Sequence, residues 1–236
     1  MEQHAFRSLS RITANSYRKC GRYAYYFALG KLRLDPVFRT VLGAGLIASG
    51  TRVLDLGCGA GLLLSVLVEV EKLHQLRAWP QDWPIAPRDL RLYGIERDAR
   101  AAQWARTTLA GHATIETADL RHAALPPCDV VVLLDVLHYL KAGEQRSLLE
   151  KVAHSLSPDG QILMRVGDAT ARPSFTLTCD RIGTLLRGQA WPHYHVRPVR
   201  EWQALLAEIG FESAPQPMIA ATPFRNILLR ARRRRG

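Results

Sequence analysis

Three alternate glycines follow a carboxylate in one short segment of the chain. Asp55 ends an apolar stretch, and Gly57, Gly59 and Gly61 carry no Cβ that would keep a ligand away from the backbone. Residue 62 is Leu, whereas a dinucleotide-binding turn has its third glycine at that position. The segment predicts a nucleotide-type pocket for a ligand other than NAD, with a ligand-free strand-to-helix turn as the alternative.

A second carboxylate, Glu96, ends the apolar stretch that begins at Leu92. Parallel strands end at one edge of their sheet, so Glu96 is expected beside the glycine turn. A carboxylate there can accept one hydrogen bond from each of the two hydroxyls of a ribose. The alternative is a surface carboxylate paired with Arg97 or Arg100.

The order of these elements resembles that of the class I S-adenosylmethionine-dependent methyltransferases. Behind the glycine turn and Glu96 come Asp119, after a third predicted strand, and then the segment from Asp135 to Leu140. That segment reads D-V-L-H-Y-L and is similar to the family's D-V-L-H-H-L, with Tyr139 in place of the common second histidine. The segment 156–163 also follows in the family's order.

The resemblance implies S-adenosylmethionine as cofactor and S-adenosylhomocysteine as product. It also implies that Asp119 lies near the adenine amino group, although an Asp that caps the next turn is the alternative. The cofactor-binding residues that it implies are Asp55, Gly57, Cys58, Gly59, Gly61, Glu96, Arg97, Asp119, Leu120, Asp135 and Val136.

Three histidines are candidates for a catalytic base. Methyl transfer from a sulfonium depends on alignment and exclusion of water, and a strong base is not obligatory. With a phenol, a hydroxyl or an activated ring carbon as acceptor, a histidine that titrates near neutrality can take the proton. The candidates are His138, in the turn after the fourth predicted strand, and His193 and His195 in a loop. The alternative for each is a structural or surface histidine.

Two further segments, 27–39 and 221–229, resemble those of bacterial methyltransferases found with aryl-polyene pigments of the xanthomonadin type. This resemblance implies an aromatic acceptor, either free or bound to an acyl carrier protein. The tyrosines of the first 30 residues, together with Trp79 and Trp83, line an aromatic pocket or close a lid, or else pack in the core and on the surface.

The net charge of +11 favours an acidic partner, such as nucleic acid, a phosphorylated carrier or an anionic membrane surface. The arginines are scattered, however, and the one dense run, Arg230 to Arg235, is predicted to be a solvated tail. An RNA methyltransferase is an alternative, but the segment 134–140 lacks the N/D-P-P-Y/F/W form of base-amine methylators. A binding protein without catalysis is a further alternative, against which the intact glycine turn and Glu96 speak.

The composition favours one α/β domain with no membrane insertion. No apolar run approaches the roughly 20 residues of a membrane helix, and no secretory signal opens the chain, so a cytoplasmic location is expected. Cys20, Cys58, Cys128 and Cys179 lie far apart, which predicts neither a metal site nor a disulfide framework. Cys58 and Cys128 are predicted to be small buried residues.

Strands and helices alternate from residue 51 on. This pattern predicts an α/β fold, a Rossmann-like seven-stranded mostly parallel sheet with helices on both faces. The predicted strands are 51–56, 90–96, 113–117, 129–134, 161–166, 211–218 and 224–230, and the predicted helices after residue 50 are 61–74, 98–110, 143–156, 175–186 and 199–209. Residues 157–160 are predicted to form a turn.

Three regions follow from this assignment. Residues 1–49 form an N-terminal helical cap over the pocket, or else helices packed at the edge of the sheet, with Asp35 and Pro36 starting one of them. Residues 50–230 form the domain that resembles a methyltransferase, and residues 231–236 form the basic tail.

Overall fold

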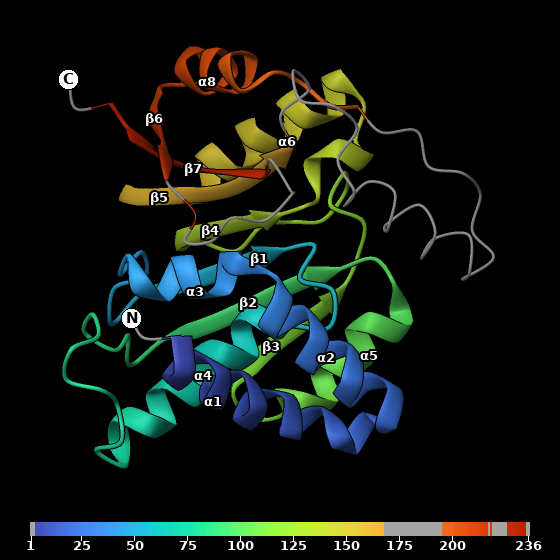
Figure 1. Ribbon diagram of the computed structural model, residues 1–236. Helices are drawn as coiled ribbons and strands as arrows, with labels where there is room; N and C mark the ends of the chain where they lie inside the picture. The colour runs from blue at the N-terminus through green and yellow to red at the C-terminus, as the bar shows by residue number, and fades with distance from the viewer. Residues whose placement is uncertain (1–2, 168–194, 217, 219–225, 235–236) are drawn as a thin grey trace.

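The computed structural model describes residues 3–167, 195–216, 218 and 226–234. Its seven-stranded sheet has the order β3-β2-β1-β4-β5-β7-β6 (Figure 1). The strands from β3 to β5 in this order are parallel, and β7 is antiparallel to both β5 and β6. The predicted fold class, a mostly parallel seven-stranded sheet with helices, is therefore confirmed.

The strands are β1 Arg52–Leu56, β2 Arg91–Glu96, β3 Ala113–Thr117, β4 Cys128–Leu134, β5 Leu156–Gly167, β6 Phe211–Gln216 and β7 Asn226–Arg233. The helices are α1 Gln3–Asn15, η1 Ser16–Cys20, α2 Arg22–Leu34, α3 Pro36–Gly43, α4 Leu62–Gln75, α5 Ala99–Thr108, η2 Leu137–Tyr139, α6 Ala142–Ser155 and α8 Val199–Glu208. The helix predicted at 175–186 lies outside the described residues, as do His193 and Cys179.

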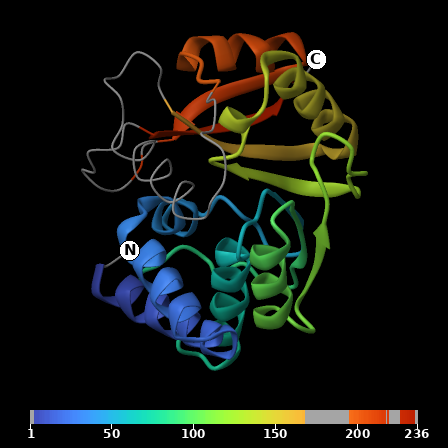
Figure 2. The ribbon, with the colours of Figure 1, turned by 90° about the vertical axis from the view of Figure 1, so that its right-hand side faces the viewer.

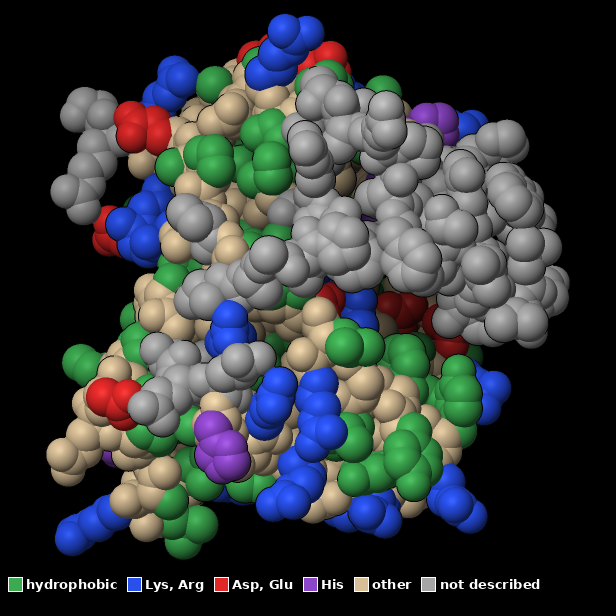
Figure 3. All heavy atoms as spheres, in the orientation of Figure 1, with side chains coloured by type: hydrophobic (Ala, Val, Ile, Leu, Met, Phe, Trp, Pro, Cys, Tyr) green, Lys and Arg blue, Asp and Glu red, His purple; other side chains and the backbone are tan. Residues whose placement is uncertain are grey.

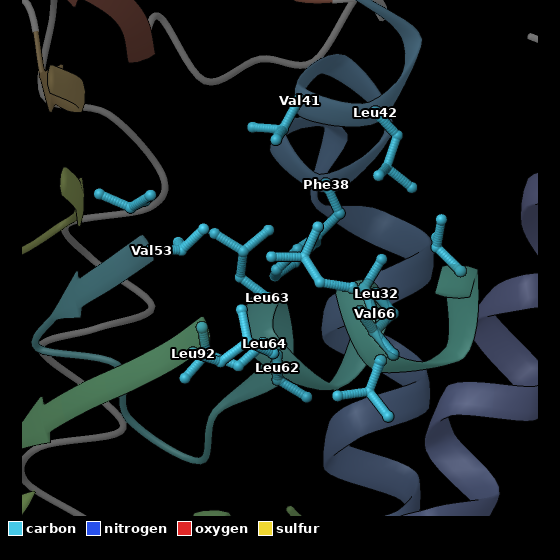
Figure 4. Packing of buried hydrophobic residues seen from close by; sticks show 14 of the residues in the cluster. Leu32, Phe38, Val41, Leu42, Val53, Leu62, Leu63, Leu64, Val66 and Leu92 are labelled. Carbon is cyan, nitrogen blue, oxygen red and sulfur yellow. The ribbon is translucent and has the colours of Figure 1, made fainter. Parts of the chain in front are cut away.

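Helices cover both faces of the sheet because the strand side chains alternate between two apolar clusters. Val53 of β1 packs with the helices α1 to α5, whereas its neighbour Leu54 packs with α6 and α8. Figures 1 and 2 show these two groups of helices on opposite sides of the sheet. In Figure 4, side chains of α4 lie between the strand residues Val53 and Leu92 and the N-terminal residues Leu32 and Phe38.

Two predicted boundaries were wrong. The turn predicted at 157–160 lies within β5. Leu156 pairs with Cys128 of β4 and Gln161 pairs with Val130, so the residues between Leu156 and Gln161 form an irregularity in the strand. The tail predicted at 231–236 begins too early, because β7 continues to Arg233, which pairs with Phe211. The Arg233 guanidinium also donates to the carbonyls of Ala153 and Leu156, so this charge is held against the sheet.

The N-terminal helices form an additional layer on α4 and α5. The buried Tyr17 hydroxyl donates to the Ala60 carbonyl at 2.8 Å and lies 2.8 Å from the Ser65 hydroxyl, so it supports the glycine turn from behind. Asp35 caps α3 by accepting from the Val37 amide, as predicted from its type. Two parts of this segment therefore reach the carboxyl edge of the sheet: Tyr17 at the glycine turn and Asp35 at the α2–α3 junction.

Candidate functional site

The glycine turn follows β1, and two of its glycines have different surroundings. Gly57 has φ 72°, and a Cβ built on it would lie 2.3 Å from a methyl carbon of Val136, so the turn and the end of β4 touch here. Gly59 has φ 55°, yet a Cβ added to it would meet no atom of the described residues within 4 Å. The backbone at Gly59 therefore faces open space, which a ligand can approach closely.

Glu96 lies at the end of β2 and holds this turn. One carboxylate oxygen accepts from the Gly59 amide at 2.8 Å, and the other accepts from the Asp98 amide at 2.7 Å. Each oxygen keeps a further lone pair for a second donor. No ion pair joins Glu96 to Arg97 or Arg100 in the described part of the chain, so the paired-surface alternative is wrong.

Asp55, between these groups, is 3% exposed. Burial, and then the nearby charge of Glu96, raise the pKa of Asp55 to about 7. Two carboxylates this close disfavour each other's ionisation, and a cationic group between them would relieve that repulsion. The turn therefore offers an opening with acceptors and a site that favours positive charge.

Asp119, at the end of β3, is held by its own loop. Its carboxylate accepts from the Arg121 amide at 3.0 Å and from the Arg121 guanidinium at 2.6 Å. These bonds hold the pKa of Asp119 well below its usual range, and the charge of Arg97 adds a little. The turn-capping alternative is what the described contacts show, while Leu120 beside it is buried in the core.

A buried arginine joins the end of β4 to the N-terminal helices. Arg165 of β5, 4% exposed in its side chain, donates from Nε to Asp135 at 2.8 Å and through a second nitrogen to the same carboxylate. It also donates to Asp35 at 2.5 Å. Lys31 adds a second cation, with Nζ 3.1 Å from Asp35 and 4.0 Å from Asp135. We call Lys31, Asp35, Asp135 and Arg165 the charge cluster.

The backbone and the charges in this cluster are both constrained. Asp135 has φ 58°, a conformation that a residue with a side chain rarely adopts and that the bidentate pair with Arg165 helps to hold. Burial alone would raise the pKa of Asp35, but the Arg165 guanidinium and the Lys31 ammonium lower it to about 2. The bidentate contact with Arg165 holds Asp135 in an ion pair.

His138 lies in η2, one turn after Asp135. Burial lowers its pKa to about 4, so its imidazole is neutral at pH 7 and holds a proton weakly. Its ring packs against that of Tyr139, with centroids 4.2 Å apart. The backbone carbonyl of His138 accepts from the amide of His195 at 2.8 Å, which brings two of the predicted histidines together through the main chain. The His195 side chain is exposed.

Gln145 holds η2 and His195 together, and the sequence patterns assigned it no role at the site. The fully buried amide donates to the carbonyls of Leu137 at 3.0 Å, Leu140 at 3.1 Å and His195 at 3.0 Å. Its oxygen accepts from Arg197 at 2.7 Å. Its sequence signal is that of a polar residue on the apolar face of α6. Arg165 has a similar signal, since it is a charged residue within the apolar run of β5.

The tryptophans Trp79 and Trp83 lie away from this site. They pack edge to face, with centroids 4.8 Å apart, and line a cavity of about 830 Å³ formed by the end of α4 and the loop before β2. Since α4 starts at the glycine turn and runs back along the sheet, this cavity lies at the amino edge. Trp83 is buried and Trp79 is partly exposed, and both line this cavity rather than the edge that carries the glycine turn.

The cysteines and histidines form no metal centre in the ranges that the structure covers. Cys128 is buried as predicted, whereas Cys58 is partly exposed. Within the same ranges, every helix is too short or too polar to cross a membrane.

Known proteins share this architecture. A profile described as a methyltransferase domain matches residues 29–215. An uncharacterized methyltransferase of Anoxybacillus flavithermus is 30% identical over 128 residues, which are 53% of this chain and 51% of that protein. The mitomycin 7-O-methyltransferase MmcR superposes with a TM-score of 0.59 at 18% identity, over 92% of this chain and 60% of its own.

A second solved structure, magnesium protoporphyrin IX methyltransferase from Synechocystis with bound S-adenosylhomocysteine, has a TM-score of 0.57 at 19% identity. The match covers 99% of this chain and 100% of that chain. The chain spans about half the length of the curated relative, 51%, and 60% of MmcR.

Proposed function

We propose that this chain, which belongs to the methyltransferase domain family, transfers a methyl group from S-adenosylmethionine to a small aromatic acceptor. The main observation in favour of this cofactor is the geometry of Glu96. Its two carboxylate oxygens accept from the Gly59 and Asp98 amides, and each keeps one lone pair for a ribose hydroxyl. The open backbone at Gly59 lets a ligand approach. The residues present fit the cofactor.

The chain's own residues would hold and align the reactants. When bound, the cofactor supplies an electrophilic methyl on a cationic sulfur. Asp55 and Glu96 make this edge of the sheet favourable for the positive charge, and the Gly57–Val136 contact fixes the turn against the end of β4. As the acceptor oxygen bonds to the methyl carbon, the sulfur–methyl bond breaks and the acceptor releases its proton.

The release of that proton does not depend on a strong base. His138 has a pKa of about 4, so it binds a proton weakly and would be a poor general base. Asp135 is paired with Arg165. We therefore infer that an acidic acceptor, such as a phenol, loses its proton largely to water, or to the exposed His195 beside His138. His193, which lies outside the described residues, is proposed as a further candidate for the proton acceptor.

An aromatic acceptor is supported by two considerations. The segments 27–39 and 221–229 resemble those of methyltransferases associated with aryl-polyene pigments. Among solved structures with this fold is the mitomycin 7-O-methyltransferase. An RNA acceptor, suggested by the charge of +11, is the competing possibility that experiment must separate.

We expect S-adenosylhomocysteine at about 100 times its dissociation constant to raise the melting temperature by roughly 5–10 °C, because the ligand binds only the folded state. Methyl transfer from labelled S-adenosylmethionine is then measured with hydroxybenzoic acids and with total RNA. Transfer to the phenolic acids supports the proposal. Transfer to RNA alone, or no thermal shift for folded protein, would contradict it.

Cofactor affinity is expected to increase with pH through the titration of Asp55. Its pKa is raised to about 7, so the fraction ionised rises about tenfold from pH 6 to pH 8. The ammonium group of S-adenosylhomocysteine favours the ionised carboxylate, and its affinity should rise by a similar factor. Calorimetry at both pH values tests this, with Asp55→Asn as the control that loses the pH dependence. An equal pH dependence in that variant would rule out Asp55 as its source.

A further inference from the structure

The outer face of α2 carries an exposed apolar stripe that the core does not use. Ala24, Ala28 and Leu32 are buried on the inner face of this helix. On its outer face Tyr23 is 69% exposed, Tyr26 60%, Phe27 40% and Leu34 75%. These four residues follow the spacing of one side of a helix. We call them the aromatic stripe.

Cations surround the aromatic stripe almost without opposing charge. The described N-terminal residues 3–50 contain a single acidic residue, Asp35, and its side chain is 8% exposed and paired with Arg165. The basic residues of the same range are Arg7, Arg11, Arg18, Lys19, Arg22, Lys31, Arg33 and Arg39. Figure 3 shows basic and hydrophobic side chains side by side over the lower front of the molecule, where Figure 1 places α1 and α2.

The stripe continues onto α5. Tyr23 and Phe27 lean on Trp104, with ring centroids 5.9 Å and 6.3 Å away, and the Arg100 guanidinium lies 5.2 Å from the Trp104 ring centroid. Exposed tyrosine and arginine at the centre of a patch are typical of protein interfaces.

The arrangement fits a protein better than a nucleic acid or a membrane. Stacking of bases needs free ring faces, but the rings of Tyr23 and Phe27 are packed at a tilt against Trp104. An interfacial membrane helix separates its cations from its apolar residues, whereas here the Arg100 guanidinium lies against the Trp104 ring within the patch. A complementary partner has an acidic rim around an apolar centre.

The stripe also leads toward the site. Leu34 ends it, and the next residue, Asp35, belongs to the charge cluster with Asp135 at the end of β4. A partner on the stripe would therefore hold a tethered group beside the carboxyl edge of the sheet.

We propose that the aromatic stripe and its surrounding cations dock a small acidic carrier protein that bears the aromatic acceptor on a flexible covalent arm. This inference rests on the proposed function. The acceptor stays attached to the arm throughout: its phenolic oxygen gains the methyl group, the sulfur–methyl bond breaks, and the phenolic proton leaves. The carrier supplies affinity through its surface, and the charge cluster and η2 lie where its arm would end.

Binding is tested first, without methyl transfer. The probe is a fluorescent acyl carrier protein of the source organism loaded with a 4-hydroxybenzoyl group, and binding is followed by anisotropy. We expect Arg22→Glu/Arg33→Glu to weaken binding by about tenfold or more, since both changes place like charge opposite the carrier. The matched control Arg77→Glu/Arg88→Glu reverses two cations at the amino edge and should bind as the unmodified protein does. Tyr26→Ser should also weaken binding.

Catalysis then separates this inference from the proposed function. The Arg22→Glu/Arg33→Glu variant should raise KM about tenfold for the carrier-bound acceptor and leave kcat/KM for free 4-hydroxybenzoate within about twofold. Equal binding of the carrier by both double variants would overturn the docking surface, even if free acceptor is methylated. The docking surface would also be overturned by a different pattern of binding. In that pattern the unmodified protein binds transfer RNA or phosphatidylglycerol vesicles but not the carrier, and Arg22→Glu/Arg33→Glu loses this binding. Carrier binding without methylation of any acceptor would contradict only the proposed function.

Discussion

Replacing Glu96 with alanine is expected to weaken S-adenosylhomocysteine binding by about a hundredfold or more. Hydrogen bonds to a charged acceptor contribute about 1.5–3 kcal/mol each, and two ribose hydroxyls would lose their acceptor. The variant also frees the Gly59 amide, which Glu96 now holds at 2.8 Å, so the turn becomes less ordered before the ligand arrives. Isothermal titration calorimetry measures the change directly.

The matched variant Glu96→Gln separates charge from shape. Its amide oxygen can accept from one backbone amide, but its NH2 group must face the other, so an intermediate loss of affinity is expected. Because the charge of Glu96 contributes to the raised pKa of Asp55, both variants should also lower that pKa from about 7. An unchanged dissociation constant in Glu96→Ala, with the fold intact, would refute the ribose role.

Replacing Arg165 with methionine is expected to be the most destabilising of the changes considered, by about 3–5 kcal/mol, because it leaves Asp35 and Asp135 with only the partly exposed Lys31 as a cationic partner. Arg165 is 4% exposed in its side chain and joins Asp35 and Asp135, which lie on different parts of the chain. Urea unfolding at pH 7 measures the loss. A loss under about 1 kcal/mol, typical of a surface pair, would show that the cluster is not a buried network.

The control removes all three charges together. In Asp35→Asn/Arg165→Met/Asp135→Asn, asparagine at position 35 can still cap α3, and no carboxylate remains unpaired, so much of the stability should return. The pH dependence follows from Asp35, whose pKa falls from its ordinary 3.8 to about 2. Its contribution is complete above about pH 4 and is lost as the pH falls through 2. Arg165→Met should show a smaller acid-dependent loss, because only Lys31 and the Val37 amide then still lower the pKa of Asp35.

The charge cluster also bears on the proposed reaction. It fixes Asp135 at φ 58° and connects the end of β4 to the α2–α3 junction, where the aromatic stripe ends. A partner bound to α2 could therefore affect the position of Asp135 and of the η2 turn that carries His138. Arg165→Met should accordingly reduce methyl transfer at temperatures where the variant is still folded.

The sequence by itself determined the parts of the protein whose chemistry is local. Asp55, the three glycines and Leu62 are neighbours along the chain, and a left-handed turn without Cβ atoms is specified by those residues alone. The strand at 113–117 and the start of α3 at Pro36 were likewise predicted correctly, since apolar periodicity and capping act over a few residues.

Only the tertiary structure decided which distant residues meet. Arg165 and Asp35 are 130 positions apart, and Gln145 and His195 are 50 apart, so neither pairing has a local signature beyond a polar residue in an apolar run. The extension of β7 to Arg233 depends on its place between β5 and β6. Burial in the fold also lowers the pKa of His138 and commits Asp135 to an ion pair, because desolvation and long-range charge pairing exist only once the chain is packed.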